Sequence, residues 1–176
     1  MIQKVRVYPD PVLREVSKPV EKIDQEIKTL IKEMTKTMRA HEGVGLAAPQ
    51  VGILQRVIVI GLPDEEPISI INPELSKPAG EGIFEEGCLS LPGVRVPVKR
   101  AVHVKVHGLF PNGKTLKIEA KDLFARVVQH EVDHLNGILI IDKLPKKERL
   151  EFELNYIRIL SQEKVTLASN KKQKEV

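Results

Sequence analysis

The chain has 176 residues, of which 41% are hydrophobic and 30% charged, and its formal net charge is +4. These values are ordinary for one globular domain, and the length excludes two domains of usual size. The single cysteine excludes an internal disulfide, and the sequence has no apolar run long enough to cross a bilayer.

The sequence carries no signal for base recognition or for export. It has only four phenylalanines and two tyrosines, and no basic stretch is interleaved with them, so stacking platforms for nucleic-acid bases are not expected. We therefore expect no binding to a specific nucleic-acid sequence and no membrane contact. The N-terminus, MIQKVRVYPDPVL, has neither the apolar core of a secretory signal nor the composition of a transit peptide. The expected compartment is the cytoplasm.

In the first half of the chain, a helix precedes a glycine-rich loop and two strands. Residues 24–41 have apolar side chains at helical spacing, with Asp24 as the expected N-cap and Gly43 just beyond the end. The next stretch, GVGLAAPQVG (43–52), contains three glycines and a proline, which exclude a regular helix. The remaining segments are two predicted strands, residues 56–61 and 67–75, and a predicted loop over residues 76–82.

The second half predicts antiparallel strands followed by two helices. Alternating residues on both sides of the turn PNG predict a β-hairpin over residues 101–120, after a strand over residues 94–100. Asp122 is expected to cap a helix that Gly137 interrupts. The last predicted segments are a strand over residues 138–141 and a helix from Pro145 to about residue 161.

This order of elements shows no alternation of the βαβ kind. It predicts an α+β fold with mostly antiparallel strands. We expect a single domain over residues 1–165 and a basic, flexible C-terminal tail over residues 166–176, which contains the sequence KKQKEV.

The predicted helix after Asp122 carries the motif His-Glu-x-x-His within QHEVDH. Residues four apart on an α-helix lie about 40° apart around its axis, so His130 and His134 face one side and can reach one cation. Glu131 is poorly placed as a third ligand, but it is close enough to take a proton from water at that cation. A solvated surface helix is the alternative interpretation. The apolar turns around the motif instead favour a buried helix whose ionisable residues have a function.

Two histidines do not complete a catalytic metal site, which usually has three protein ligands. A histidine ten residues after the first is absent, because Ile140 stands there. A glutamate of the last helix, Glu151 or Glu153, is one candidate for the third ligand. The only cysteine, Cys88, is another, since a thiolate is a strong ligand. A nucleophilic Cys88 paired with His130 is a further hypothesis.

Three segments together resemble the signature motifs of the peptide deformylase family. The similarity covers most of the chain, with Val44 where isoleucine is common and Leu91 where valine is common. Neither difference changes a catalytic atom type. The resemblance implies a single catalytic metallohydrolase domain in which strands surround a central helix carrying His-Glu-x-x-His, with a C-terminal helix. The three segments are GVGLAAPQ (43–50), EGCLS (86–90) and QHEVDH (129–134).

The resemblance also implies roles for individual residues. Glu131 would be the general acid and base, while the Gln50 side-chain amide and the Leu89 backbone N–H would stabilise the oxyanion. The metal would most often be Fe²⁺, with Ni²⁺, Co²⁺ or Zn²⁺ able to replace it. The implied metal ligands are Cys88, His130 and His134.

The substrate implied by the resemblance is a nascent peptide that begins with N-formyl-methionine, from which formate is released. The C-terminal helix and the lysine-rich tail would contact the ribosome. Arg95 would lie near the peptide. The pocket for the methionine side chain would be lined by Val44, Phe84, Leu123 and Val127, with backbone groups of Gly45 and Gly87 turned to the peptide.

Two other classes of protein remain open at this point. A zinc endopeptidase would use Glu151 or Glu153 as its third ligand, and a ribosome-associated or structural metal module would have no enzymatic activity. Outside the motifs, we expect Arg126 to pair with Asp133 at the surface, because they lie on one helix face. We also expect Glu86 to bind a neighbouring arginine.

Overall fold

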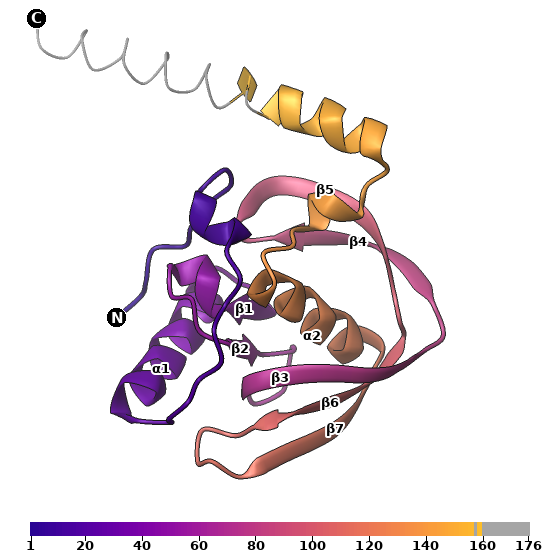
Figure 1. The fold of residues 1–176 in the computed structure, drawn as a ribbon. Helices are drawn as coiled ribbons and strands as arrows, with labels where there is room; N and C mark the ends of the chain where they lie inside the picture. Colours follow the sequence, from indigo (N-terminus) through magenta and orange to yellow (C-terminus); the bar gives the residue numbers. More distant parts are fainter. Residues whose placement is uncertain (157, 160–176) are drawn as a thin grey trace, which may run out of the picture. The chain divides into compact units, whose positions relative to one another are not determined.

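The computed structural model describes residues 1–156, 158 and 159 (Figure 1). The chain divides into two compact units, Met1–Ile140 and Ile141–Val176. Within the described residues, no helix combines the length and the apolar character needed to span a membrane. The elements in chain order are η1 (Pro11–Arg14), α1 (Gln25–Ala40), β1 (Gly45–Ala47), η2 (Ala48–Val51), β2 (Val57–Ile60), β3 (Ile68–Ala79), β4 (Gly82–Cys88), β5 (Leu91–Arg100), β6 (His103–Leu109), β7 (Thr115–Lys121), α2 (Asp122–Leu135) and η3 (Ile140–Lys143).

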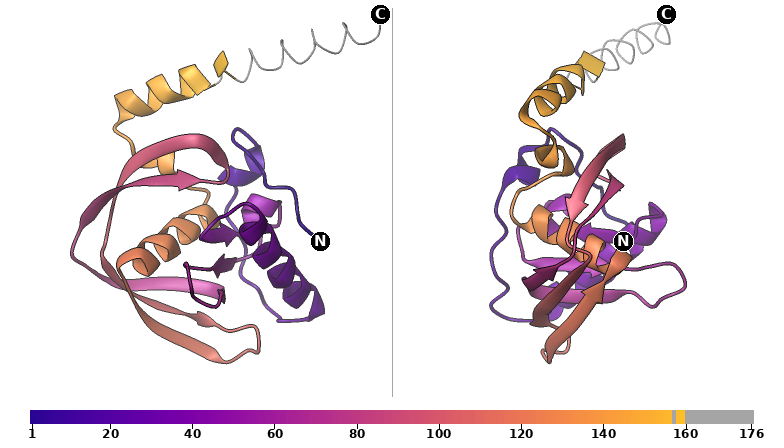
Figure 2. Two further views of the ribbon diagram at one scale, coloured as in Figure 1. Left: turned by 180° about the vertical axis from the view of Figure 1, so that it is seen from behind. Right: turned by 90° about the vertical axis from the view of Figure 1, so that its right-hand side faces the viewer.

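The strands form two antiparallel sheets on either side of α2. One sheet has five strands in the order β1-β2-β3-β6-β7, and the other is the pair β4-β5. Figures 1 and 2 show α2 between the five-stranded sheet and the β4-β5 pair. The predicted α+β architecture with a central helix is confirmed.

The helix α1 forms where the apolar spacing predicted it. The Asp24 carboxylate accepts hydrogen bonds from the backbone N–H groups of Glu26 and Ile27, which caps the helix. The helix ends at Ala40, and Glu42 then adopts a left-handed φ of 54°. The prediction had placed Gly43, the next residue, just beyond the end of the helix. The residues that α1 buries, Leu30, Ile31, Met34, Thr37 and Met38, pack toward β1 and β2.

The strand β2 is buried on both faces, which explains its uninterrupted sequence VIVI. Val57 and Val59 belong to the apolar cluster beneath α1. Ile58 and Ile60 belong to the cluster beneath α2, together with Val128. Since successive side chains of a strand point to opposite faces, one short strand supports both helices. The helix α2 therefore packs on a strand that is buried on both faces.

Two predictions were wrong, one of a loop and one of a strand. Residues 76–82 are not a loop, because β3 continues to Ala79 and β4 begins at Gly82. The polar residues there pair with β6 across register shifts, so no simple alternation marks the strand. Residues 138–141 are not a strand, because a 3-10 helix begins at Ile140. A short apolar run without periodicity does not distinguish these conformations.

The helix boundaries agree with the predictions to within a residue or two. Asp122 is the first residue of α2, and Lys121 is its N-cap. Gly137 follows the helix with a left-handed φ of 70°, and an added Cβ there would collide with the Arg14 backbone. Residues 146–156, 158 and 159 are helical. The rest of the predicted last helix and the predicted tail lie outside the described residues.

Candidate metal centre and active site

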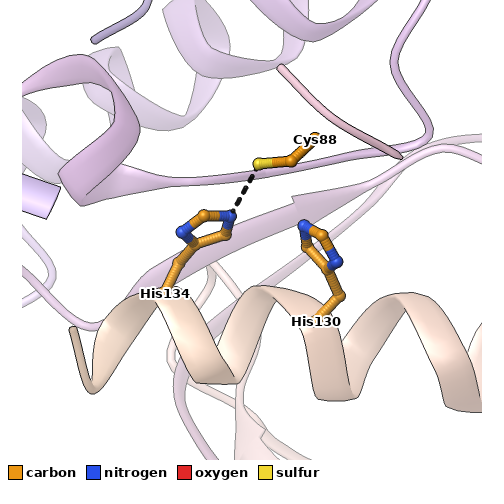
Figure 3. Close-up of side chains that lie close together, drawn as sticks. All are labelled: Cys88, His130 and His134. Atoms are coloured by element: carbon orange, nitrogen blue, oxygen red, sulfur yellow. Dashed lines mark hydrogen bonds between the residues drawn. The ribbon is translucent and has the colours of Figure 1, made fainter. Parts of the chain in front are cut away.

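The structure brings the three predicted metal ligands together (Figure 3). His130 and His134 project from one side of α2 with their ring centroids 5.0 Å apart. Cys88, the last residue of β4, places its Sγ 3.2 Å from Nε2 of His134. One ligand atom from each residue lies within 4.8 Å of the others. In the part of the chain that the structure describes, this is the only group of three or more such side chains.

The tight end of the β4-β5 hairpin determines where the thiol lies. Cys88 pairs with Leu91 after a register shift, so the chain reverses directly beyond the sulfur. Tyr8 donates its backbone N–H to the Ser90 carbonyl at 2.9 Å, which ties this turn to the N-terminal segment. The hairpin thus holds Cys88 above the histidines of a different element.

Gln50 lies beside the sulfur and is held at both ends of its amide. Its Oε1 accepts a hydrogen bond from the Ala47 backbone N–H at 2.8 Å. Its Nε2 donates to Ser90 Oγ at 3.2 Å and points to Cys88 Sγ at 3.6 Å. The buried amide therefore presents its N–H groups, rather than its oxygen, toward the candidate metal site.

A buried carboxylate orients His130. Glu86 Oε2 lies 3.1 Å from His130 Nδ1, which leaves Nε2 of this ring for a cation. Arg100 binds both oxygens of Glu86, at 2.7 and 2.9 Å, and Arg126 binds Oε1 at 2.6 Å. Burial alone would raise the pKa of Glu86, but the hydrogen bonds from His130 and Arg100 lower it from 4.5 to about 2. The carboxylate is therefore charged at neutral pH.

The prediction that Glu86 binds an arginine is confirmed, whereas the predicted pair of Arg126 and Asp133 is wrong. Asp133 instead accepts a hydrogen bond from Arg100 Nη1 at 2.8 Å. Arg126 reaches back to the β4-β5 pair, where it also donates to the carbonyls of Val98 and Gly82. Sequence reasoning did not identify Arg100. The signal that could have identified it was its position, because Arg100 ends the strand β5 on a buried face that is otherwise apolar.

Glu131 is buried next to the histidines. Its Oε2 has no hydrogen-bond partner among the residues that the structure describes. Burial raises the pKa of Glu131 from 4.5 to about 7. A side chain at Gly45 would collide with this carboxylate, because an added Cβ would lie 2.9 Å from Glu131 Cδ and 2.8 Å from Val127 Cγ1. The glycine leaves the space that the carboxylate occupies. A group with a pKa near neutrality is suited to accept and return a proton.

The two histidines differ in their affinity for protons. Burial and the charge of His130 hold the pKa of His134 well below its usual 6.5, so this ring is neutral. Burial also acts to lower the pKa of His130, but hydrogen bonds to Cys88 and Glu86 raise it to about 10. A cation would replace the proton on this ring. One sulfur and two imidazole nitrogens fit a divalent transition metal, and the unpaired Glu131 oxygen lies beside them.

A cleft of about 700 Å³ leads to this centre. Its lining includes Cys88, His130 and Glu131, together with Gln50 and Leu89. Six of the seven residues predicted for substrate binding also line the cleft: Val44, Gly45, Gly87, Arg95, Leu123 and Val127.

Phe84 is the exception among the predicted substrate residues. It is 61% exposed and is not part of the cleft lining. Its ring lies against the Arg126 guanidinium, with Cζ 4.7 Å from the ring centroid. Since side chains alternate along a strand, Phe84 lies on the same face of β4 as Glu86 and Cys88, and its ring contacts the helix at Arg126.

Comparisons with known proteins agree with this geometry. The sequence profile of the polypeptide deformylase family matches residues 2–150. The chain belongs to the polypeptide deformylase family. The peptide deformylase of Dictyoglomus turgidum is 48% identical over 153 residues, covering 87% of this chain and 99% of that protein. The peptide deformylase of Dictyoglomus thermophilum is 52% identical over 143 residues, covering 81% and 93%.

Solved structures of polypeptide deformylases share the fold. The Legionella pneumophila peptide deformylase aligns with a TM-score of 0.84 at 42% identity, covering 92% of this chain and 98% of that one. The Thermotoga maritima peptide deformylase aligns with a TM-score of 0.80 at 44% identity, covering 82% and 99%. The enzyme is a metal-dependent hydrolase that removes the formyl group from N-formyl-methionyl peptides. This membership decides against the endopeptidase and the inactive metal module.

Proposed function

We propose that Cys88, His130 and His134 hold the divalent metal of the deformylation reaction. The observation that carries this proposal is the approach of all three ligand atoms to within 4.8 Å of one another, from two separate elements. The neutral His134 ring and the Glu86 bond to His130 Nδ1 support it, because both prepare ring nitrogens for a cation.

The metal we propose is Fe²⁺, with Ni²⁺, Co²⁺ and Zn²⁺ as ions that the same ligands accept. When bound, a divalent cation supplies Lewis acidity, which polarises a carbonyl and lowers the pKa of water. A thiolate among the ligands favours transition metals over Mg²⁺ or Ca²⁺, which prefer oxygen.

Glu131 moves the proton in the proposed mechanism. Its pKa of about 7 lets it accept a proton from the attacking water and return that proton to the nitrogen of the leaving amine. Gln50 Nε2 and the Leu89 backbone N–H stabilise the negative charge that develops on the formyl oxygen. The Gln50 amide is already oriented for this, because the Ala47 N–H holds its oxygen away from the site.

The cleft provides the proposed binding site for the first residues of the substrate. The apolar side chains of Val44, Leu123 and Val127 line it and would contact the unbranched methionine side chain. Gly45 and Gly87 would offer backbone groups to the peptide, and Arg95 would lie near its later residues. Phe84 is not included in this pocket, because it does not line the cleft and its ring packs on the Arg126 guanidinium.

The experiment that tests these assignments combines metal analysis with two substrates. Protein purified without oxygen should contain one equivalent of a transition metal, predominantly iron, and should release formate from a formyl-methionyl peptide. The same peptide without the formyl group should remain intact. Cys88→Asp should fold and shift the metal preference toward ions that favour oxygen ligands. An unchanged metal profile in this variant would contradict ligation by sulfur.

We further propose that the enzyme works in the cytoplasm and contacts the ribosome through its C-terminal helix and tail. The lysines near the end of the sequence support this, because ribosomal RNA is a polyanion. Deleting the residues after Asn170 should weaken co-sedimentation with ribosomes. Unchanged co-sedimentation would contradict the proposed contact between the tail and the ribosome.

A further inference from the structure

The outer face of α1 carries a row of cations that the deformylation reaction does not use. Lys28, Lys32 and Lys36 follow one another at four-residue spacing, and Arg39 continues the row. All four side chains are exposed. At a rise of 1.5 Å per residue, the row extends over about 16 Å along one side of the helix. We call these four residues the α1 cationic row.

The three lysines of the row have no ion-pair partner among the residues that the structure describes. Arg39 approaches Glu66 only at 3.9 Å, and both side chains are largely exposed. Glu33, an acidic residue of α1, is occupied by the N-terminal ammonium and by Gln3 Nε2, each at 3.1 Å.

The three lysines of the row repel one another along the helix, and only Arg39 lies in the last turn, where the helix dipole favours a cation. Like charges at i and i+4 destabilise a helix, and the row contains two such pairs, Lys28 with Lys32 and Lys32 with Lys36. The opposite face of α1 is anchored by buried side chains such as Met34 and Met38. Figure 1 shows α1 at the edge of the unit Met1–Ile140, beside β1 and β2. The cations therefore stand on a fixed, accessible line.

We propose that the α1 cationic row binds the phosphate backbone of RNA without reading base sequence. A line of fixed cations complements a linear polyanion, and phosphate contacts give affinity without sequence information. The helix offers no aromatic side chain on which bases could stack. The proposal therefore agrees with the absence of base-stacking signals in the sequence.

RNA is favoured over an anionic membrane and over DNA. A helix that lies on a membrane inserts an exposed apolar face, whereas the large apolar residues of α1 are turned to the core and Gln25 and Thr29 stand near the cations. The choice of RNA over DNA rests on the activity, because the formylated peptides are nascent chains made on an RNA-containing machine.

The test compares two triple variants of the full-length chain. One replaces Lys28, Lys32 and Lys36 by Gln. The matched control replaces three other exposed lysines in and just before β7 by Gln, with the same loss of charge: Lys114, Lys117 and Lys121. Binding to a fluorescently labelled RNA duplex is measured by anisotropy across a series of KCl concentrations.

Each lysine that contacts a phosphate contributes about 1 to the slope of log K against log salt concentration. The row variant should therefore lose about 3 from the wild-type slope, while the control should keep it. An equal change in both variants, or none in the row variant, would overturn the proposal. Repeating the series in a chain that ends at Asn170 should give the same difference, and its disappearance there would assign the contact to the tail.

Two further measurements separate the partners. Formaldehyde crosslinking in cells should attach ribonuclease-sensitive material to the wild type and less of it to the row variant. Tighter binding to phosphatidylserine vesicles than to RNA, or crosslinked material sensitive only to deoxyribonuclease, would overturn the proposal. Hydrolysis of a short formyl-methionyl peptide is measured separately and should be equal in both variants. A failure of the catalytic assignment would thus appear in wild-type hydrolysis and not in the salt series.

Discussion

The helices α1 and α2 are similar in length, with 16 and 14 residues, but they place charged side chains in opposite ways. The helix α1 buries apolar residues and Thr37, and its charged groups face outward. The helix α2 buries Glu131 and His134 within the same kind of apolar face. Amphipathic spacing alone explains α1. In α2, burying ionisable groups has a free-energy cost that amphipathic spacing does not explain, and the chemistry that we propose for these groups accounts for it.

The largest effect should come from Glu131→Gln. The substitution keeps the shape of the side chain but removes the carboxylate that moves the proton in the proposed mechanism, so activity should fall by about 10²- to 10⁴-fold. Metal content should not fall, because Glu131 is not one of the proposed metal ligands. Tm should not fall either, because burial disfavours the charged carboxylate, raising the pKa of Glu131 to about 7, and Gln is neutral. Formate release and elemental analysis measure both. Glu26→Gln, which changes an exposed carboxylate of α1, should leave activity unchanged.

The next largest effect should come from Glu86→Gln, which weakens the buried ion pairs with Arg100 and Arg126. Disrupting a buried pair from one side costs about 3–5 kcal/mol, and His130 should bind metal less tightly. The control is Glu81→Gln, which disrupts an exposed pair with Lys99 and should cost about 1 kcal/mol or less. Equal losses in urea unfolding would contradict the distinction between buried and exposed charges.

The same carboxylate should make stability depend on pH. Burial opposes its charge, but the hydrogen bonds from His130 and Arg100 prevail and lower the pKa of Glu86 from 4.5 to about 2. Because the folded-state pKa is depressed, this contribution is present above pH 4.5 and lost as the pH falls toward 2. The wild type should lose more stability across this window than Glu86→Gln. If the wild type and Glu86→Gln lost the same free energy of unfolding across this pH window, the ionised Glu86 carboxylate would contribute no pH-dependent stability.

A smaller effect should follow from Gly45→Ala. The new methyl group would displace Glu131 and Val127, and a misplacement near 1 Å lowers activity by up to about 10²-fold. Metal content should stay near the wild-type value. Gly113→Ala is the control, because an added Cβ there meets nothing within 4 Å, the turn does not line the cleft, and its left-handed φ of 81° affects stability rather than activity. If both variants lose activity alike, space for Glu131 is not the reason for the glycine.

The smallest effect should come from Asp24→Ala in α1. Loss of the N-cap, which accepts from Glu26 and Ile27, costs about 1 kcal/mol, and activity should not change. Asp24→Asn should retain the stability, since Asn caps a helix about as well. Thermal unfolding of the two variants measures the difference. A loss of activity in Asp24→Ala would mean that α1 and the site are more tightly coupled than their separate packing indicates.

Local patterns predicted those elements whose signal is contained in neighbouring residues. Apolar spacing and an N-cap located α1, and the motif in QHEVDH located the two histidines on α2. The long strand β3 was cut short because its polar second half pairs with β6 across bulges. The strand β4 was missed because its intermediate and exposed positions show no regular alternation. Pairing partners distant in the chain determine such strands, and no local window contains them.

The sequence by itself determined that two histidines and a glutamate share a helix, and the resemblance of three short segments indicated the family. The tertiary structure decided which groups surround them. Only folding brings Cys88 from β4 to His134, turns Arg126 away from Asp133 and toward Glu86, and places Arg100 between two carboxylates. The physical reason is that helical spacing is local, whereas a buried charge takes its partners from whichever elements the core packs against it.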